Sequence, residues 1–167
     1  MTALNHPIRI SRVDYADRLH ALALVHLLDA YAHDPMGGGA GLTEYAKAHV
    51  VGGLASRPQA FSVLAFAQDE TPVGLVNCIE GFSTFAAKPL VNIHDVIVLP
   101  DWRGRGVAGA MLESVIQIAR DRGACKLTLE VLSGNQKALR AYAKLGFDAY
   151  QLDPQAGTAQ FLQLWLD

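Results

Sequence analysis

The sequence has few cysteines, no long apolar run and almost no excess of charge. Its 167 residues include only two cysteines, Cys78 and Cys125. Both lie where a strand or its start is expected, so we interpret them as small buried hydrophobic residues in a reducing compartment, not as a disulfide or metal pair. No stretch of about eighteen apolar residues occurs, which argues against a membrane-spanning helix.

The charges are balanced and dispersed along the chain. Fourteen Lys and Arg residues stand against sixteen Asp and Glu residues, a formal net charge of −2. This balance lacks the basic patch that a nucleic-acid-binding protein needs. The N-terminus lacks a long apolar run behind a basic patch, so no signal peptide is expected. At this length we expect one domain over residues 1–167. We also expect a cytoplasmic location and no bound metal.

The hydrophobic pattern predicts an alternation of strands and helices. Apolar and polar residues alternate over Ile8–Val13, as in a half-buried strand, and then recur at helical spacing from Tyr15 to about Ala32. The segment His33–Leu42 has four glycines within five residues and should form a mobile loop. Thr43 is the expected N-cap of a second helix, Glu44–Leu54. The remaining predicted elements are strands Ala60–Ala67, Val73–Phe82 and Val91–Val98, a helix from Val107, strand Leu127–Val131, a helix from Asn135, and strands Phe147–Leu152 and Gln160–Leu166.

The turn after the strand Val91–Val98 carries the strongest chemical signal. It reads RGRGVAG over Arg103–Gly109 and opens directly into a helix. The start of a helix has unpaired N–H groups and partial positive charge, which suit a pyrophosphate, and glycines allow its close approach. The turn has neither the Gly-Lys-Ser/Thr of a Walker loop nor the later acidic residue of a dinucleotide fold. Taken alone, such a turn is also typical of a tight connection.

Two motifs together resemble those of a known family. Arg103–Ala108 fits Arg-x-x-Gly-x-Ala, one form of the acetyl-CoA signature of the GNAT N-acetyltransferases. Farther on, Asn135–Phe147 fits the family's Asn-x-x-Ala-x-x-x-Tyr-x-x-x-Gly-Phe, at the expected distance behind a strand. The order of predicted elements also resembles that of the family over essentially the whole chain, most closely from Val73 to Phe147.

The resemblance implies a mixed α/β fold and a place for acetyl-CoA. The expected GNAT fold is a central twisted mixed sheet of about seven strands with four helices and splayed central strands. The splay leaves backbone groups of the central strand free to pair with pantetheine, and one N–H would bond the thioester oxygen. The cofactor-binding residues implied are Val96, Ile97, Val98, Arg103, Gly104, Arg105, Gly106, Val107, Ala108, Gly109, Asn135, Ala138 and Tyr142.

The resemblance also implies that Tyr142 is catalytic, donating a proton to the leaving thiolate. The pKa of a free cysteine thiol is about 8.5 and that of tyrosine is about 10, so this transfer is nearly balanced. The alternative is an amphipathic tyrosine that packs its ring and leaves its hydroxyl in water. Asn135 could hold the pantetheine arm, cap its helix, or do both.

The acceptor side is less clearly marked. His94 and Asp95 should lie on opposite faces of their strand unless a bulge intervenes. Their surroundings resemble the Leu-Glu-Asp run of the diamine acetyltransferase branch, but His94 stands where that branch has its glutamate. His94 is therefore a candidate catalytic base, with a hydrogen-bonded sheet histidine as the alternative. Asp34, Glu80 and Asp95 are candidate substrate-binding residues, with solvated surface charge as the alternative.

The sequence thus predicts an enzyme that moves acetyl from acetyl-CoA to a primary amine of a small molecule, by direct attack in a ternary complex. The alternative is a non-catalytic acyl-CoA-binding or sensor domain of the same fold. The first two helices and the loop His33–Leu42 should contact an acceptor resembling a polyamine or an amino acid. We expect no nucleic-acid or membrane partner. A homodimer is one expected assembly, and the sequence leaves the oligomeric state open.

Overall fold

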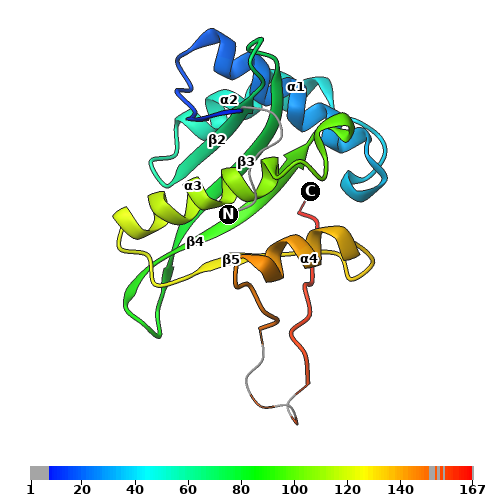
Figure 1. The fold of residues 1–167 in the computed structure, drawn as a ribbon. Coiled ribbons are helices and arrows are strands. Elements are labelled where there is room, and N and C mark those ends of the chain that lie inside the picture. Colours follow the sequence, from blue (N-terminus) through cyan, green and yellow to red (C-terminus); the bar gives the residue numbers. More distant parts are fainter. Residues whose placement is uncertain (1–7, 151–152, 154, 156, 167) are drawn as a thin grey trace. The chain divides into compact units, whose positions relative to one another are not determined.

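The computed structural model describes residues 8–150, 153, 155 and 157–166. The chain forms two compact units, residues 1–129 and 130–167. The first unit contains the whole sheet and the first three α-helices, and the second contains the last α-helix (Figure 1). Within the described part, no helix is long and apolar enough to cross a membrane.

The sheet of the first unit has five described strands in the order β1-β2-β3-β4-β5. The pairs β1–β2, β2–β3 and β3–β4 are antiparallel, whereas β4–β5 is parallel, so the sheet is mixed. The strands are β1 (Arg9–Arg12), β2 (Ala60–Phe66), β3 (Pro72–Ser83), β4 (Lys88–Val98) and β5 (Leu127–Leu129).

Each α-helix except α3 begins at a side chain that accepts hydrogen bonds from exposed N–H groups. Asp17 caps α1, and the predicted caps Thr43 and Asn135 of α2 and α4 are confirmed. The helices are α1 (Arg18–His33), α2 (Glu44–Ala55), α3 (Val107–Asp121) and α4 (Gln136–Lys144), with short 3-10 turns η1 (Pro35–Gly37) and η2 (Pro100–Trp102).

Helices cover both faces of the sheet, with α1 and α2 on one side and α3 on the other (Figure 1). Leu24 and Leu27 of α1 pack in one cluster with Leu64, Leu75 and Ile97, which occupy three adjacent strands. Gly74, the strand neighbour of Leu75, faces the opposite way, since a Cβ there would lie 2.7 Å from Cε of Met111 in α3. The alternation of side chains along β3 thus divides the core into two layers.

The prediction of seven strands is wrong: the described residues form five. Phe147–Tyr150 forms no strand, and the other two residues of that predicted strand, 151 and 152, lie outside the described residues. Gln160–Leu166 is described without strand structure, and its large apolar side chains are exposed. Alternating apolar residues fit a pleated surface, but a strand also needs a partner to complete its backbone hydrogen bonds. The sequence pattern shows the apolar side chains but does not show whether a partner strand is present.

Candidate active site

A bulge in β4 places His94 and Asp95 differently from a regular strand. Asn77 of β3 lies opposite Asp95, and the next residue, Cys78, lies opposite Ile93, so His94 has no residue across from it. His94 is exposed and Asp95 is half-buried. The bulge that the sequence analysis left open is therefore present, and it presents the imidazole to solvent beside the carboxylate.

Beyond the bulge, β4 has a strand partner on one side only in the described part of the sheet. Its parallel pairing with β5 covers just Val91–Ile93, so the two strands part there, as the expected splay requires. The N–H of Leu99 donates to the Val73 carbonyl at 3.0 Å, which directs Leu99 toward β3. Because backbone groups alternate along a strand, Val96 and Val98 direct theirs to the opposite edge. The Val98 carbonyl there accepts a bond from Nε of Arg103 at 2.9 Å.

The glycine-rich turn leads from this edge into the start of α3. Gly104 and Gly106 have φ of +78° and +84°, a left-handed conformation that favours glycine. Gly106 occupies the N-cap position without a side-chain cap, so the first N–H groups of α3 have no capping partner. The Arg105 guanidinium lies 5.2 Å from the centre of the Trp102 ring and adds positive charge at the turn. This arrangement suits an anion.

Arg103 and Asp34, predicted for different ligands, contact each other. A guanidinium nitrogen of Arg103 lies 2.7 Å from Oδ2 of Asp34. The Met36 N–H and then Arg103 hold the pKa of Asp34 below its usual range. The pair joins the end of α1 to the glycine-rich turn. Arg103 was predicted to attract a phosphate and Asp34 a cationic substrate, and in this pair the two charges neutralise each other.

A cavity of about 210 Å³ lies between the end of α1 and the end of β4. Burial raises the pKa of the Tyr31 phenol, and the negative charges of Asp95 and Asp34 raise it further. Two carboxylates therefore act on a phenol that lines this cavity. Its lining residues are Ala30, Tyr31, His33, Asp34, Ile97, Val98, Leu99, Pro100 and Arg103.

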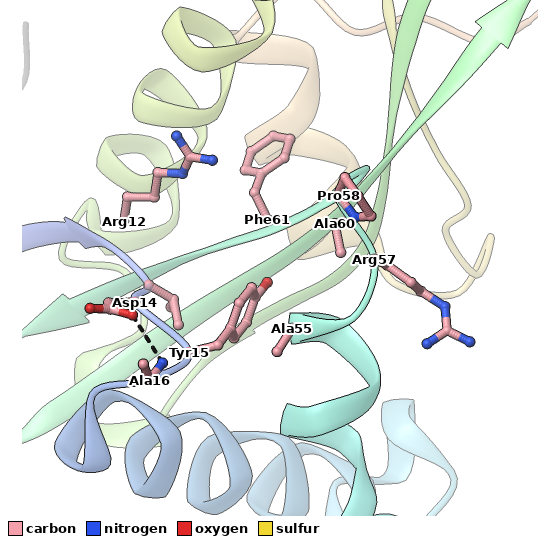
Figure 2. A pocket seen from close by; sticks show the side chains of 10 residues that line it. Arg12, Asp14, Tyr15, Ala16, Ala55, Arg57, Pro58, Ala60 and Phe61 are labelled. Atoms are coloured by element: carbon pink, nitrogen blue, oxygen red, sulfur yellow. Dashed lines mark hydrogen bonds between the residues drawn. The ribbon is translucent and has the colours of Figure 1, made fainter.

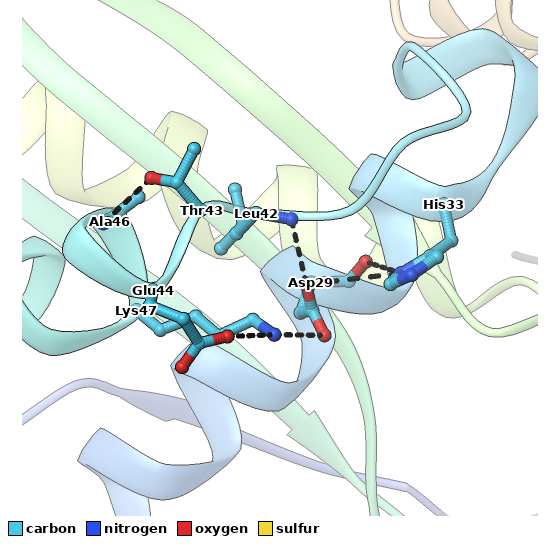
Figure 3. Close-up of polar contacts among 7 residues, drawn as sticks. All are labelled: Asp29, His33, Leu42, Thr43, Glu44, Ala46 and Lys47. Carbon is cyan, nitrogen blue, oxygen red and sulfur yellow. Dashed lines mark hydrogen bonds and ion pairs between the residues drawn. The ribbon is translucent and has the colours of Figure 1, made fainter.

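The loop between α1 and α2 is tied to α1 by polar contacts (Figure 3). Asp29 accepts a bond from the Leu42 N–H at 2.8 Å and lies 3.5 Å from Nζ of Lys47. The Leu42 bond is the main reason that the pKa of Asp29 falls below its usual value. The N–H groups of Ala40 and Gly41 both donate to the Ala32 carbonyl. These hydrogen bonds hold the C-terminal end of the loop, which was predicted to be mobile, against α1.

A buried polar row, which sequence analysis missed, crosses the sheet beside this cavity. Ser62 of β2 and Asn77 of β3 lie in register with Asp95, and their side chains are hydrogen-bonded in that order. Tyr15, which precedes α1, extends the row through a 2.9 Å contact with Ser62 Oγ. The available signal was one polar residue inside each of two apolar runs, Ser62 within residues 60–66 and Asn77 within residues 73–79.

Tyr15 also lines a second, larger cavity of about 480 Å³ (Figure 2). Asp14 at its rim accepts a bond from the Ala16 N–H at 2.9 Å. The Arg57 side chain extends away from the other labelled residues and bonds the Gly53 carbonyl. No residue that the sequence predicted for the site lines this cavity.

Glu80 and the two cysteines lie apart from the cavity beside α1. Glu80 forms a 2.9 Å ion pair with Arg122, which caps the C-terminal end of α3. Cys78 is buried as expected, and burial raises the pKa of its thiol to about 12. Cys125 is exposed, so the expectation of a buried residue is wrong there. Within the described ranges, no cluster of three or more His, Cys, Asp or Glu residues is arranged to hold a metal ion.

The remaining predicted residues belong to the second unit. The Asn135 side chain accepts a bond from the Ala138 N–H at 3.2 Å and so begins α4. Tyr142 lies two turns farther along the helix and is half-buried. Its ring centre lies 5.9 Å from that of Phe147, so the last residue of the motif Asn135–Phe147 packs back against α4.

Comparisons with known proteins identify the family and the fold. The sequence profile described as "Acetyltransferase (GNAT) family" matches residues 23–147. The chain is 36% identical over 78 residues to an uncharacterized N-acetyltransferase of Methanocaldococcus jannaschii, an alignment covering 46% of this chain and 34% of that protein. It is 34% identical over 56 residues to the thialysine N-epsilon-acetyltransferase of Bos taurus, covering 34% and 33% of the two chains.

These alignments span about a third of each curated relative. The fold similarity extends much farther. The crystal structure of a probable acetyltransferase superposes with a TM-score of 0.79 at 22% identity, over 95% of this chain and 99% of the other. The family profile covers most of the chain, including both motifs and the bulged strand. The chain belongs to the GNAT family of acetyltransferases.

Proposed function

We propose that this protein transfers the acetyl group of acetyl-CoA to a primary amine of a small molecule. The observation that carries the proposal is the open edge of β4 at Val96–Val98, which the glycine-rich turn connects to the uncapped start of α3. An extended pantetheine arm can pair with such an edge as an added strand would. The pyrophosphate can bind the N–H groups at the start of the helix. The residues present therefore fit acetyl-CoA.

In the proposed reaction, the amine attacks the thioester within a ternary complex. The amine lone pair forms the new C–N bond, and the electron pair of the broken C–S bond leaves on sulfur. A backbone N–H of Val96 or Val98 stabilises the oxyanion, and Tyr142 protonates the thiolate. His94 accepts the proton that an ammonium group must lose before attack. The buried, protonated Cys78 thiol is a poor nucleophile, which supports direct attack over an acetyl-cysteine.

The acceptor proposed is small and cationic. The cavity beside α1 holds about 210 Å³, less than a drug-sized ligand occupies, which suits an aminoalkyl chain. Asp34 is already paired with Arg103, so the carboxylate proposed to attract an ammonium group is Asp95. The bovine relative is named for thialysine, which supports an acceptor of amino-acid size. Polyamine-like and amino-acid-like compounds are the first to try.

The test is incubation of the protein with acetyl-CoA and a panel of primary amines, with thiol release and product mass as readouts. We expect release that depends on the amine and a product heavier by one acetyl group. Measurable acetyl-CoA binding without turnover of any amine would contradict the proposal and favour a non-catalytic acyl-CoA-binding or sensor domain. The cytoplasmic location, the homodimer and the absence of nucleic-acid and membrane partners stay predictions.

A further inference from the structure

Three neighbouring strands each place one polar side chain in a single row on the α1 side of the sheet. Ser62, Asn77 and Asp95 are aligned in register, next to the apolar row of Leu64, Leu75 and Ile97. Ser62 is fully buried and Asn77 is 3% exposed. Burying polar groups costs stability unless each finds a partner, and here each does.

Asp95 at one end of the row fixes which group donates and which accepts in every hydrogen bond of the row. A carboxylate only accepts, so Nδ2 of Asn77 donates to Oδ2 of Asp95 at 2.9 Å. The Asn77 Oδ1 then faces Ser62, whose hydroxyl donates to it at 2.6 Å. Ser62 has only one proton, so the Tyr15 hydroxyl donates to Ser62 Oγ at 2.9 Å. One arrangement of donors satisfies all four residues.

We propose that Asn77 is a positioning residue of the acetyl transfer, which holds the Asp95 carboxylate beside the acceptor with Ser62 and Tyr15 supporting it from behind. The proposal rests on the proposed function and extends it to residues outside both family motifs. An amide does not pass a proton along, so the row orients Asp95 and does not conduct protons from it. Asn77 engages Oδ2 alone, which leaves Oδ1 to bind the ammonium group of the acceptor.

The groups around Asp95 make its orientation matter. Tyr31 of α1 and Cys78 of β3 both lie within range of its charge: burial raises the pKa of both groups, and the Asp95 carboxylate raises it further. His94 is its neighbour on β4. Asp34, which lines the cavity, has Arg103 as an ion-pair partner. Asp95 lies outside the lining but acts electrostatically on Tyr31, which belongs to it, so we assign to Asp95 the charge that meets a cation.

A double-mutant cycle between Asn77 and Asp95 tests the proposal. With the amine selected by the panel, Asn77→Ala should lower kcat/KM for the amine on the order of tenfold to a hundredfold, since small misplacements of a reacting group are costly. The KM for acetyl-CoA should change less than about twofold. In an Asp95→Asn background, Asn77→Ala should cause little further loss, because the group that it positions is already altered. Losses that multiply, or an equal rise in the acetyl-CoA KM, would overturn the proposal.

Asn92→Ala is the matched control. Asn92 is an asparagine of the same sheet, but its Nδ2 donates to Thr128 Oγ1 at 3.0 Å, on the β5 side of β4. Its substitution should leave kcat/KM within about twofold of wild type. Ser62→Ala and Tyr15→Phe remove successively more distant links and should cause successively smaller losses. If Asn77→Ala does not fold, Ser62→Ala takes its place in the cycle with Asp95→Asn.

A second measurement separates this inference from the proposed function. The side-chain amide signals of Asn77 in a nuclear magnetic resonance spectrum report its contact with Asp95 without any turnover. They should shift in Asp95→Asn and stay unchanged in Asn92→Ala. Unchanged Asn77 signals in Asp95→Asn would overturn the inference. A clear shift in a protein that acetylates no amine would instead contradict the proposed function and leave the contact established.

Discussion

Two glycines at opposite ends of α3 allow the cofactor role of the turn to be separated from backbone strain. Gly106 at the N-cap has φ of +84°, and Gly123, just beyond the C-terminal end, has φ of +72°. An alanine at either position must adopt a left-handed conformation, which costs about 1–2 kcal/mol. For a chain of this length, that corresponds to a fall in Tm of about 2 to 8 °C. Gly106→Ala and Gly123→Ala should therefore be destabilised to a similar extent.

Their effects on acetyl-CoA binding should differ. At Gly106, the added methyl group occupies the turn that we propose cradles the pyrophosphate, so Kd should rise at least about tenfold, or 1.4 kcal/mol. At Gly123, a Cβ would meet nothing within 4 Å and lies at the other end of the helix, so Kd should stay within about twofold.

Isothermal titration calorimetry with acetyl-CoA, at a temperature well below both melting transitions, measures the difference. Thermal unfolding of the same samples checks that the strain is matched. If both variants bind acetyl-CoA as tightly as wild type, the turn is only a connection and the proposed phosphate site is wrong. If both lose affinity equally, destabilisation and not the site explains the loss.

Three further predictions concern the chemistry. Tyr142→Phe should lower kcat by roughly tenfold to a thousandfold with acetyl-CoA affinity nearly unchanged, and equal kcat would mean that another group protonates the thiolate. If His94 is the base, kcat/KM for the amine should fall on the acidic side of the pH profile, and His94→Ala should lose that dependence; an unaltered profile would leave His94 structural. Because burial raises the pKa of Cys78 to about 12, iodoacetamide at pH 8 should modify the exposed Cys125 first in the native protein, as peptide mass spectrometry would show; prior modification of Cys78 would contradict its burial.

The elements predicted best from sequence were those whose signal is local. Helical spacing identified α1, and Thr43 and Asn135 stand at the caps of α2 and α4 as expected. The family match likewise follows from a short turn and a short helix whose spacings lie within the sequence itself. Caps and turns depend on neighbours along the chain, so they can be read without knowing the rest of the fold.

The predictions that failed or stayed open depended on distant partners. Gln160–Leu166 is rich in large apolar residues and was predicted to be a strand, yet it forms none in the described structure. Arg103 and Asp34 are 69 positions apart, and nothing near either residue indicates that they pair. The bulge at His94 could be stated only as a condition, because it depends on how β3 aligns with β4. Contacts between residues far apart in the sequence depend on how the whole chain folds, so a short segment of sequence does not reveal them.

The buried polar row shows how the alternation of side chains along a strand can form both the hydrophobic core and the candidate active site. Alternation along β3 sends Leu75 and Asn77 to the same face, and the register of β4 sets Ile97 and Asp95 opposite them. A one-residue slip of that register would take Ile97 out of the cluster beneath α1 and separate Asp95 from Asn77, at the cost of an unpaired buried amide. The loss of apolar packing and the unpaired buried amide therefore both oppose the same change of register. The apolar row and the polar row together hold β4 in the register that brings Asp95 to the end of α1, where the proposed chemistry needs it.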